Sequence, residues 1–450
     1  MRLIDALRVE TTSRIALVGS GGKSSAILRL GSEWQKPSVL AATAHFGINQ
    51  TGFAGKHIIW EVSESINISS IILDCENVVT GPPRDEFVLF GVDPSQWDLI
   101  NKLGNFHQVP VFLESDGSKS RPLKTPADHE PPIPKWVNHV VVSIGLSVLG
   151  LELNEQNVHR SEIFSARTGL KINEPVTIKS IICMLKHPEG GLKNIPAGAR
   201  KTVLFNQTDA LKDISVLQEF EESLLASYDA IIFASLQGVN NQFSVEEQPN
   251  EVIKTVEKTA GIILAGGNSK RMGTPKALLS WEGIPFVRAC VLQAIAAGLD
   301  PVYVIAGNEY NAILKAVSEL PVVVIMNNEW QTGQSSSVRA GIKALPENIG
   351  SVVFQLVDQP QIPQTLIRQM VNEHSLTLSA IVLPESGGRR ANPVLFDKVT
   401  FSDLLKLEGD VGGRSIFSKY PVRAVPWNDE AILLDVDTPE DYENLKSYSK

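Results

Sequence analysis

The sequence predicts an α/β protein of two domains, each built on a mostly parallel sheet that is covered by helices. Short apolar, β-branched runs recur along the 450 residues and alternate with segments long enough to form helices. Most of these runs are apolar throughout, which is typical of strands that are buried on both faces. The length exceeds what a single core usually holds, so more than one domain is expected.

Composition narrows the class of protein. Hydrophobic residues make up 43% and charged residues 20% of the chain, and the mean hydropathy is +0.01, as in soluble globular proteins. No run approaches the ~20 apolar residues of a membrane span, and the first residues lack a secretory signal, so we expect a cytoplasmic protein without a membrane partner. A net charge of −9 without a long basic run argues against nucleic acid as the partner. The three cysteines have no disulfide or zinc spacing.

The expected strands fall into two sets. Those of the first half are 14–19, 38–43, 70–74, 109–115, 139–145, 201–206 and 229–235. Those of the second half are 261–266, 301–307, 322–327, 351–357, 380–385, 393–397 and 431–437. Between the halves, the polar stretch 240–260 shows no strand signal before Gly261, which suits a linker. The predicted domains are therefore 1–245 and 259–450, joined by a linker at 246–258.

The second half begins with a strand that runs into the turn "GGNSKRMGTPK" at 266–276. Open α/β sheets bind ligands at the carboxyl ends of their strands, where this turn lies. Gly266 and Gly267 let backbone amides form a concave nest that suits a polyphosphate, and Arg271 and Lys276 add neutralising charge. A phosphate site is favoured over a plain turn here, with the preceding residues Leu264 and Ala265 as part of it.

Carboxylates end two later strands of this half. Asp358 follows one apolar run, and Asp435 and Asp437 end another. Because side chains alternate between the faces of a strand, Asp435 and Asp437 would share one face of it. Such hard oxygen ligands beside a phosphate loop suit Mg²⁺. Asp437 stands before "TPED" and could equally cap the last helix. The only histidine after Gly261 is His374, which we expect on the surface of a helix.

These residues belong to a longer pattern. The motif LAGGxSxRMGxxK resembles the signature of the nucleotidyltransferases that attach a nucleotide to the molybdenum cofactor. Five further motifs follow in that family's order: "TGQSSSVRAGI", "LVDQPQIP", "GGRRANPVLF", "GDVGGRSIF" and "LLDVDTPEDY". The resemblance spans 261–442. It implies a Rossmann-like fold of the nucleotide-diphospho-sugar transferase type, with CTP or GTP as substrate, a molybdopterin-type molybdenum cofactor as acceptor and pyrophosphate as product.

The resemblance also assigns roles. It makes Arg271, Lys276 and Asp358 catalytic, with Asp358, Asp435 and Asp437 as ligands of Mg²⁺. Hydroxyls and amides before a helix suit contacts with the base or the phosphates, at Ser335, Ser336, Ser337 and Arg339. Candidates for holding the phosphate of the acceptor are Arg389, Arg390 and Asn392, although an arginine pair is as often simply solvated.

The identity of the nucleotide stays open at the sequence level. Cytidylyl members of the family usually have LAAG at the turn and guanylyl members LAGG; this chain has LAGG, whereas its later motifs look cytidylyl-type. An added methyl at Gly266 would act sterically near the base. Val357 also stands where the family commonly has glycine, a difference that is expected to change only how the strand packs. Since the acceptor phosphate is already anionic near neutral pH, the transfer needs no general base.

The first half carries a second glycine turn, "IALVGSGGKSS" from Ile15. It is a shortened relative of the Walker A loop, with two residues rather than four between Gly19 and Gly22. Its contacts to phosphate and Mg²⁺ are expected from Gly21, Gly22, Lys23 and Ser24.

A polar run at 114–131 follows the strand that ends near Glu114. Its acidic residues would serve as a Walker B carboxylate does, with Asp116 as the expected metal ligand. The run also contains Lys119, Arg121, Lys124, His129 and Glu130. With the glycine turn and "NVHR" at 157–160, this string resembles the accessory protein family of selenium-dependent molybdenum hydroxylases. His159 is as often structural as functional.

The leading hypothesis is therefore a cofactor-maturation enzyme in which a P-loop-like accessory domain is fused to a molybdenum cofactor nucleotidyltransferase. The resemblance implies a molybdenum hydroxylase apo-enzyme as protein partner. Two alternatives remain open: a sugar-phosphate nucleotidyltransferase, and a carrier that delivers the cofactor without chemistry, with its nucleotide loops as switches.

Overall fold

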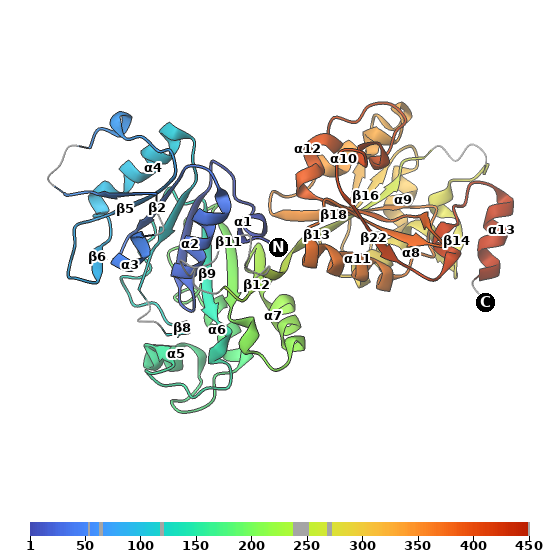
Figure 1. Ribbon diagram of the computed structural model, residues 1–450. Coiled ribbons are helices and arrows are strands. Elements are labelled where there is room, and N and C mark those ends of the chain that lie inside the picture. Colours follow the sequence, from blue (N-terminus) through green and yellow to red (C-terminus); the bar gives the residue numbers. More distant parts are fainter. Residues whose placement is uncertain (53–54, 63–65, 118–120, 237–251, 268–271, 449–450) are drawn as a thin grey trace. The chain divides into compact units, whose positions relative to one another are not determined.

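The computed structural model describes residues 1–52, 55–62, 66–117, 121–236, 252–267 and 272–448 (Figure 1). The chain divides into two compact units, Met1–Val256 and Glu257–Lys450. Both units are α/β, as the sequence predicts. No helix within the described ranges is at once long enough and apolar enough to cross a bilayer.

The first unit is built on a sheet whose described pairings are parallel. Its strands, in spatial order, are β12 (Ala230–Ala234), β11 (Arg200–Asn206), β9 (His139–Gly145), β1 (Arg14–Gly19), β7 (Val111–Glu114), β2 (Ser38–Ala42), β5 (Glu76–Thr80) and β4 (Lys56–Ile59). The strands β1 and β7 are neighbours, so the glycine turn after β1 and the acidic run after β7 emerge at the same edge.

Both faces of this sheet are buried. In β1, Leu17 packs into a core with the helix α2 (Lys23–Trp34), and Val18 packs into the core on the other face. The other helices of the unit are α1 (Leu3–Ala6), α3 (Ile48–Thr51), α4 (Trp97–His107), α5 (Ser161–Thr168), α6 (Ile178–Lys186) and α7 (Leu217–Leu224). Two small ribbons complete it: β8 (Leu123–Lys124) with β10 (Val158–His159), and β3 (His45–Gly47) with β6 (Val88–Phe90).

The second unit has a mixed sheet. Its strands, in spatial order, are β17 (Val323–Met326), β16 (Val302–Ala306), β13 (Val252–Ala265), β18 (Ile349–Leu356), β21 (Val394–Asp397) and β19 (Ile381–Ser386), with β20 (Arg389–Arg390) and β22 (Val422–Pro426) also paired to β19. The first four are parallel, whereas β21 runs antiparallel to both its neighbours. Gly387 and Gly388 both have positive φ, which lets the chain reverse tightly between β19 and β20.

Helices cover both faces of this second sheet too. In β13, Ile263 packs on the side of α8 (Phe286–Ala296) and α11 (Gln364–Thr377), and Ile262 packs on the side of α10 (Gln334–Lys343). The remaining elements are α9 (Tyr310–Ala316), α12 (Phe401–Leu404), α13 (Pro439–Tyr448) and the hairpin β14 (Ser280–Trp281) to β15 (Ile284–Pro285).

The strand expected at 70–74 is wrong. The chain there forms a 3-10 turn at Ile68–Ser70, capped by the side chain of Asn67, and Ile72 is exposed. The strand of this region is β5, where Val78 and Val79 are fully buried. The apolar run therefore misled the prediction: Leu73 is buried, but the chain around it is irregular and Ile72 lies on the surface.

The strand before the second glycine turn begins earlier than expected. β13 starts at Val252, not at Gly261, since the β-branched sequence "VIKTV" suits extended chain in spite of its lysine. Of the expected linker 246–258, residues 246–251 lie outside the described ranges and 252–258 are strand. The domain limits of 1–245 and 259–450 remain a proposal beside the division after Val256.

The expected strand 431–437 is also wrong. Glu430–Leu433 form a 3-10 turn that Asp429 caps, and Asp435 and Asp437 follow in irregular chain. The backbone N–H of Val436 donates to the carbonyl of Asp358, so this segment lies beside the end of β18 without joining the sheet. The argument from alternating strand faces therefore does not apply to the two aspartates.

Candidate functional site

A cleft of about 950 Å³ opens in the second unit where β13 and β18 end. Gly266 and Gly267 follow β13, Asp358 follows β18, and the 3-10 turn Lys276–Leu278 supplies Lys276. Leu264 and Ala265, the last residues of β13, also line it. The predicted catalytic residue Arg271 lies outside the described ranges. Among the described residues, the cleft thus combines the nest of glycine amides and the cation Lys276 with four acidic residues, of which Asp358 and Asp437 lie at the lysine.

The lysine of the cleft stands between the two carboxylates. The ammonium of Lys276 lies 3.2 Å from Oδ2 of Asp358 and also donates to Oδ1 of Asp437. Burial raises the pKa of the Asp358 carboxyl, and the nearby Lys276 only partly offsets it. Burial works against the charge of Lys276, yet its hydrogen bonds to Asp437 and Asp358 leave its pKa raised. In this structure Lys276 is therefore the cation that the carboxylates of Asp358 and Asp437 share.

The residues of this site fit a divalent cation. Lys276 shows that Asp358 and Asp437 can share one positive group, and Oδ1 of Asp358 is buried with no hydrogen-bond partner among the described residues. Within those residues no three histidine, cysteine, aspartate or glutamate side chains converge as a metal cage. Mg²⁺ usually takes one or two carboxylates and completes its shell with water and phosphate, so Asp358 and Asp437 would suffice to hold it.

Asp435 has a different environment from Asp437. Its Oδ1 accepts a hydrogen bond of 2.6 Å from the side chain of Gln359, and it lines a second cavity rather than the main cleft. Burial, followed by the charges of Asp358 and Asp437, raises the pKa of its carboxyl.

That second cavity, of about 220 Å³, shares Leu264, Gln334 and Leu356 with the main cleft. Its other polar walls are Asn392, Arg414 and Asp435, where Arg414 donates to the side-chain oxygen of Asn392 at 3.4 Å. Arg389 and Arg390 of β20 are exposed and do not line it. Sequence reasoning found Asn392 but missed Arg414, although the motif "GDVGGRSIF" contains it.

The serines before α10 have partners within the chain. Ser335 donates to the carbonyl of Gly409, Ser336 donates to that of Gly333, and both are buried. Arg339 donates to Ser335 and pairs with Glu329 at 3.0 Å. These three predicted nucleotide contacts thus hold the start of the helix. Among the serines, Ser337 lines the cleft.

Gly266 faces this same serine. A methyl group built on Gly266 would lie 3.0 Å from Oγ of Ser337, so an alanine would have to displace that hydroxyl slightly. Ser337 in turn accepts a hydrogen bond of 3.0 Å from Asn327. A side chain at the position that separates LAGG from LAAG would therefore contact Ser337 first. Other residues that line the cleft and were not predicted are Glu309, Trp330, Gln334 and Asp410.

His374 is not at the surface, which corrects the expectation. It is 4% exposed, and its Nε2 lies 2.7 Å from Oδ2 of the buried Asp397. The C-terminal turn of α11 packs on β21, and this long-range contact leaves no sign in the local sequence. The cleft lining does not include His374.

The glycine turn of the first unit is tightly fixed. Gly19, Gly21 and Gly22 all have positive φ, which glycine adopts at little cost. A side chain at Gly21 would lie 2.0 Å from the backbone N of Gly145, and one at Gly22 would lie 2.1 Å from the amide of Asn206. The turn leads directly into α2, whose first residue is Lys23. Only glycine fits this close approach.

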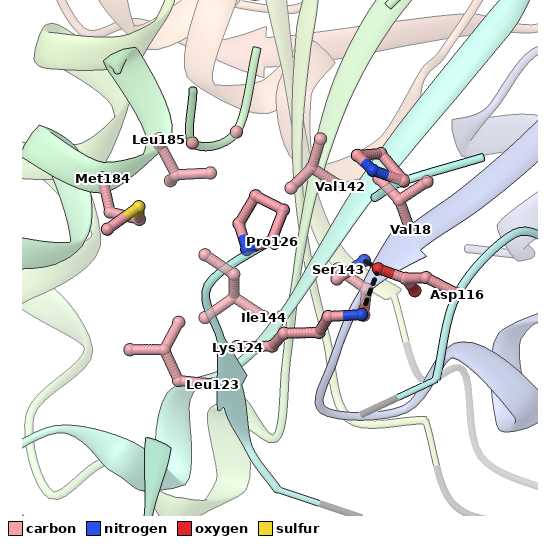
Figure 2. A pocket seen from close by; sticks show the side chains of 14 residues that line it. Val18, Asp116, Leu123, Lys124, Pro126, Val142, Ser143, Ile144, Met184 and Leu185 are labelled. Carbon is pink, nitrogen blue, oxygen red and sulfur yellow. Dashed lines mark hydrogen bonds and ion pairs between the residues drawn. The ribbon is translucent and has the colours of Figure 1, made fainter. Parts of the chain in front are cut away.

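Behind the turn lies a buried chain of alternating charges, part of which Figure 2 shows. Asp116 is 3.2 Å from Lys23 and 2.9 Å from Lys124, Glu130 is 3.0 Å from Lys124, and Arg160 is 2.6 Å from Glu130. Burial alone would raise the pKa of Glu130, but the bonds from Arg160 and Lys124 outweigh it and lower that pKa to about 2. The sequence predicted these residues as one functional run but not their pairing.

Ser24 faces Glu114, the acidic residue at the end of β7. Its hydroxyl lies 3.2 and 3.1 Å from the two carboxylate oxygens of Glu114, a residue that is 8% exposed. Burial raises the pKa of Glu114, and Lys23 opposes that shift. His129 is exposed, His159 is buried in the ribbon of β8 and β10, and Lys119 lies outside the described ranges.

Comparisons with known proteins match the two units separately. Residues 261–425 match the MobA-like NTP transferase domain, and residues 15–162 match the YqeC protein family. The two predicted resemblances are thereby confirmed.

Individual relatives divide in the same way. The chain is 33% identical over 116 residues to the uncharacterized protein YqeC of Escherichia coli, a match covering 25% of this chain and 45% of that protein, less than half of its length. It is 28% identical over 190 residues to nicotine blue oxidoreductase of Paenarthrobacter nicotinovorans, 40% of this chain and 92% of the relative. It is 27% identical over 203 residues to a probable molybdenum cofactor guanylyltransferase of Bacillus cytotoxicus, 43% of this chain and 100% of the relative.

Proposed function

We propose that this chain, which joins a YqeC domain to a MobA-like NTP transferase domain, transfers a nucleotidyl group from CTP or GTP to a molybdopterin-type molybdenum cofactor. The observation that supports this most is the cleft in which Gly266, Gly267, Lys276, Asp358 and Asp437 meet. Such a cleft joins the amides and charges that a triphosphate requires, at an edge where α/β sheets bind nucleotides. The name of the relative from Bacillus cytotoxicus supports the same acceptor.

The protein groups of the cleft would bind and orient the triphosphate. The amides of Gly266 and Gly267 hold the phosphates, and Lys276 turns from the carboxylates toward their negative charge. Asp358 and Asp437 would hold Mg²⁺, which when bound supplies further neutralisation of the phosphate charge. Arg271, which belongs to the same turn, adds a second cation in this proposal.

The acceptor would occupy the adjoining cavity. Asn392 and Arg414 provide a side-chain amide and a guanidinium there. Arg389 and Arg390 lie outside the cavity lining, and their proposed contact to the acceptor phosphate requires that this phosphate extend toward the exposed strand β20. An oxygen of that phosphate attacks the α-phosphorus, and the bond from this phosphorus to the bridging oxygen breaks to release pyrophosphate. Because the attacking oxygen is anionic, positioning by these residues replaces a general base.

The first unit would serve the maturation of selenium- or molybdenum-dependent hydroxylases in the cytoplasm, with an apo-hydroxylase as partner. The match to the YqeC family supports this part of the proposal.

The test is a transfer assay on the purified full chain. CTP and GTP are supplied separately with Mg²⁺ and purified molybdopterin cofactor, and both pyrophosphate and the dinucleotide product are measured. We expect stoichiometric release of both with one nucleotide preferred. Release with a sugar 1-phosphate alone would favour the sugar-phosphate alternative. Cofactor binding without any turnover would favour the carrier.

A relative named as an oxidoreductase makes one control necessary. The assay is repeated with reduced nicotinamide and flavin cofactors added beside the nucleoside triphosphate. Oxidation of these compounds together with the absence of pyrophosphate would contradict the proposed transfer.

A further inference from the structure

We propose that the first unit contains a site for a magnesium-bound polyphosphate, in which Ser24 and Glu114 bind the metal and Lys23 binds the phosphates. The site is built from residues of the first unit alone and goes beyond the transfer reaction proposed for the second. Its ligand chemistry is that of a nucleoside triphosphate or of inorganic pyrophosphate, and the experiment below separates these two sources.

The anion-binding half is the turn from Gly19 to Gly22 together with α2. α2 is a helix of twelve residues, and its first-turn amides carry partial positive charge. The N-cap residue Gly22 has no side chain that could bond to these amides. The steric fit of Gly21 and Gly22 against Gly145 and Asn206 fixes the turn, and Asn206 also donates to the carbonyl of Gly21 at 2.9 Å. The amides are thus held in place before a ligand binds.

The metal-binding half is the pair of Ser24 and Glu114. Neighbouring parallel strands place them, since Leu17 of β1 stands opposite Glu114 at the end of β7. The hydroxyl of Ser24 bonds to both oxygens of this carboxylate, and both groups are hard oxygen ligands. One hydroxyl and one carboxylate suffice for Mg²⁺ when phosphate and water fill the other positions.

Asp116 has a different role from the one expected from the sequence. Its Oδ2 accepts from Lys124 at 2.9 Å and from the backbone N–H of Gly19 at 3.2 Å, and its Oδ1 faces the ammonium of Lys23. Oδ1 has no hydrogen-bond partner among the described residues but forms an ion pair of 3.2 Å with Lys23. Both oxygens thus face cations, and a metal ion at Asp116 would lie directly beside Lys23 and Lys124. Asp116 is the counter-ion of Lys23, and a polyphosphate must compete with it for that ammonium.

A separate observation points to a polar ligand beside the turn. A cavity of about 30 Å³, room for about one water molecule, is lined by Gly19, Asp116, Lys124 and Ser143 among others (Figure 2). Ser143 is fully buried, and its hydroxyl oxygen has no hydrogen-bond partner among the described residues. A buried hydroxyl without a partner is costly, which indicates a polar partner for Ser143, either a bound water molecule or an atom of a ligand, beside the turn.

The experiment counts bound ligand on the full chain by calorimetry, with and without Mg²⁺. The probes are the β,γ-imido analogues of ATP, CTP and GTP and, in a separate arm, inorganic pyrophosphate. Wild-type chain should bind two equivalents of the preferred nucleotide analogue. Lys23→Ala and Lys276→Ala should each leave one equivalent, and the double variant none. Pyrophosphate binding that survives Lys276→Ala but not Lys23→Ala, without any nucleotide binding, would identify the smaller ligand.

The metal ligands are tested in a chain that carries Lys276→Ala. Glu114→Gln and Ser24→Ala should each remove the enhancement of binding by Mg²⁺, by about tenfold or more, while metal-free binding persists. Lys23→Ala should weaken binding about tenfold or more with and without Mg²⁺. Matched controls are Ser25→Ala, one residue further along α2, and Lys36→Ala, an exposed lysine after this helix. Both controls should bind as the parent chain does.

Asp116→Asn decides between the two acidic residues. If Asp116 is the counter-ion, this variant keeps the enhancement by Mg²⁺ and binds polyphosphate more tightly without metal. Loss of the enhancement in Asp116→Asn and its retention in Glu114→Gln would overturn the assignment. Should Asp116→Asn not fold, Ser24→Ala and Glu114→Gln still decide it, because unchanged enhancement in both would exclude the proposed metal site. If Lys23→Ala still binds both equivalents, the first unit has no such site.

Discussion

The two glycine turns of this chain contain the same residue types but place their lysines differently. In the first unit, Lys23 directly follows the glycines, its side chain is 3% exposed, and Asp116 holds it inside a buried charge chain. In the second unit, Lys276 comes nine residues after Gly267, lies in a cleft of about 950 Å³ and bridges two carboxylates. The lysine next to its glycines thus lies in the interior, whereas the lysine further along its turn lies in an open cleft.

The largest difference should appear in stability. Asp116→Ala leaves Lys23 and Lys124 buried without their shared carboxylate, at a cost of about 3–5 kcal/mol. Asp437→Ala should cost less than about 1 kcal/mol, because the Asp437 side chain is 53% exposed. Scanning calorimetry of both variants measures the effect as a shift of the unfolding transition. Equal shifts would show that the two lysines are not held as differently as we describe.

The transfer activity should depend on Asp358 in the cleft of the second unit. Asp358→Asn should lower kcat/KM for pyrophosphate release by about 10²–10³, since it removes the proposed metal ligand and the partner of Lys276. Polyphosphate binding by the first unit should be unchanged in this variant. The exposed substitution Glu319→Gln serves as control. Full turnover in Asp358→Asn would remove its metal role, and loss of binding at Lys23 as well would contradict two independent sites.

The charge chain of the first unit should also make stability depend on pH. The pKa of Glu130 is lowered from 4.5 to about 2, so its contribution is complete above about pH 4.5 and is lost as the pH falls toward 2. Glu130→Gln should therefore destabilise the unit by about 2–3 kcal/mol at pH 7 and by progressively less below pH 4.5. Urea unfolding of wild type and variant between pH 3 and 7 measures this. A difference that stays constant over that range would contradict the ion pair with Arg160.

The smallest effect concerns nucleotide choice at the turn of the second unit. Gly266→Ala places a methyl 3.0 Å from Oγ of Ser337, and we expect the ratio of kcat/KM for CTP and GTP to change severalfold, or about 1 kcal/mol. Adding Ser337→Ala should relieve the contact and reduce the change. If Gly266→Ala shifts the ratio equally with and without Ser337, the methyl does not act through this hydroxyl.

Much of the cleft was predictable because its residues end neighbouring elements of a parallel sheet. Lys276 and Asp358 are 82 positions apart, yet each follows a strand whose carboxyl end faces the same edge. The same reasoning predicted the fold class and grouped Lys23 with the acidic run after β7. The order of the strands in the sheet brings such residues to one edge, independently of the direction in which each side chain points.

What the sequence could not predict depends on where individual side chains point. Ser335 and Ser336 bond to backbone carbonyls because Gly333 packs closely on the chain near Asp410, a contact of 2.5 Å for a side chain built on that glycine. His374 is buried because a partner 23 residues away, Asp397, reaches it. Asp435 turns from the main cleft because Gln359 holds it. Apart from the bond of Ser336 to Gly333, which is local, these contacts join residues far apart in the sequence, and local patterns of residues do not record them.

The strand β13 crosses the division between the two units. It begins at Val252 in the first unit and continues to Ala265, directly before Gly266 in the second, and Lys254 is tied to Glu221 of α7 by an ion pair of 2.7 Å. A second half that began at residue 259 would lack residues 252–258, which form the first part of its central strand β13.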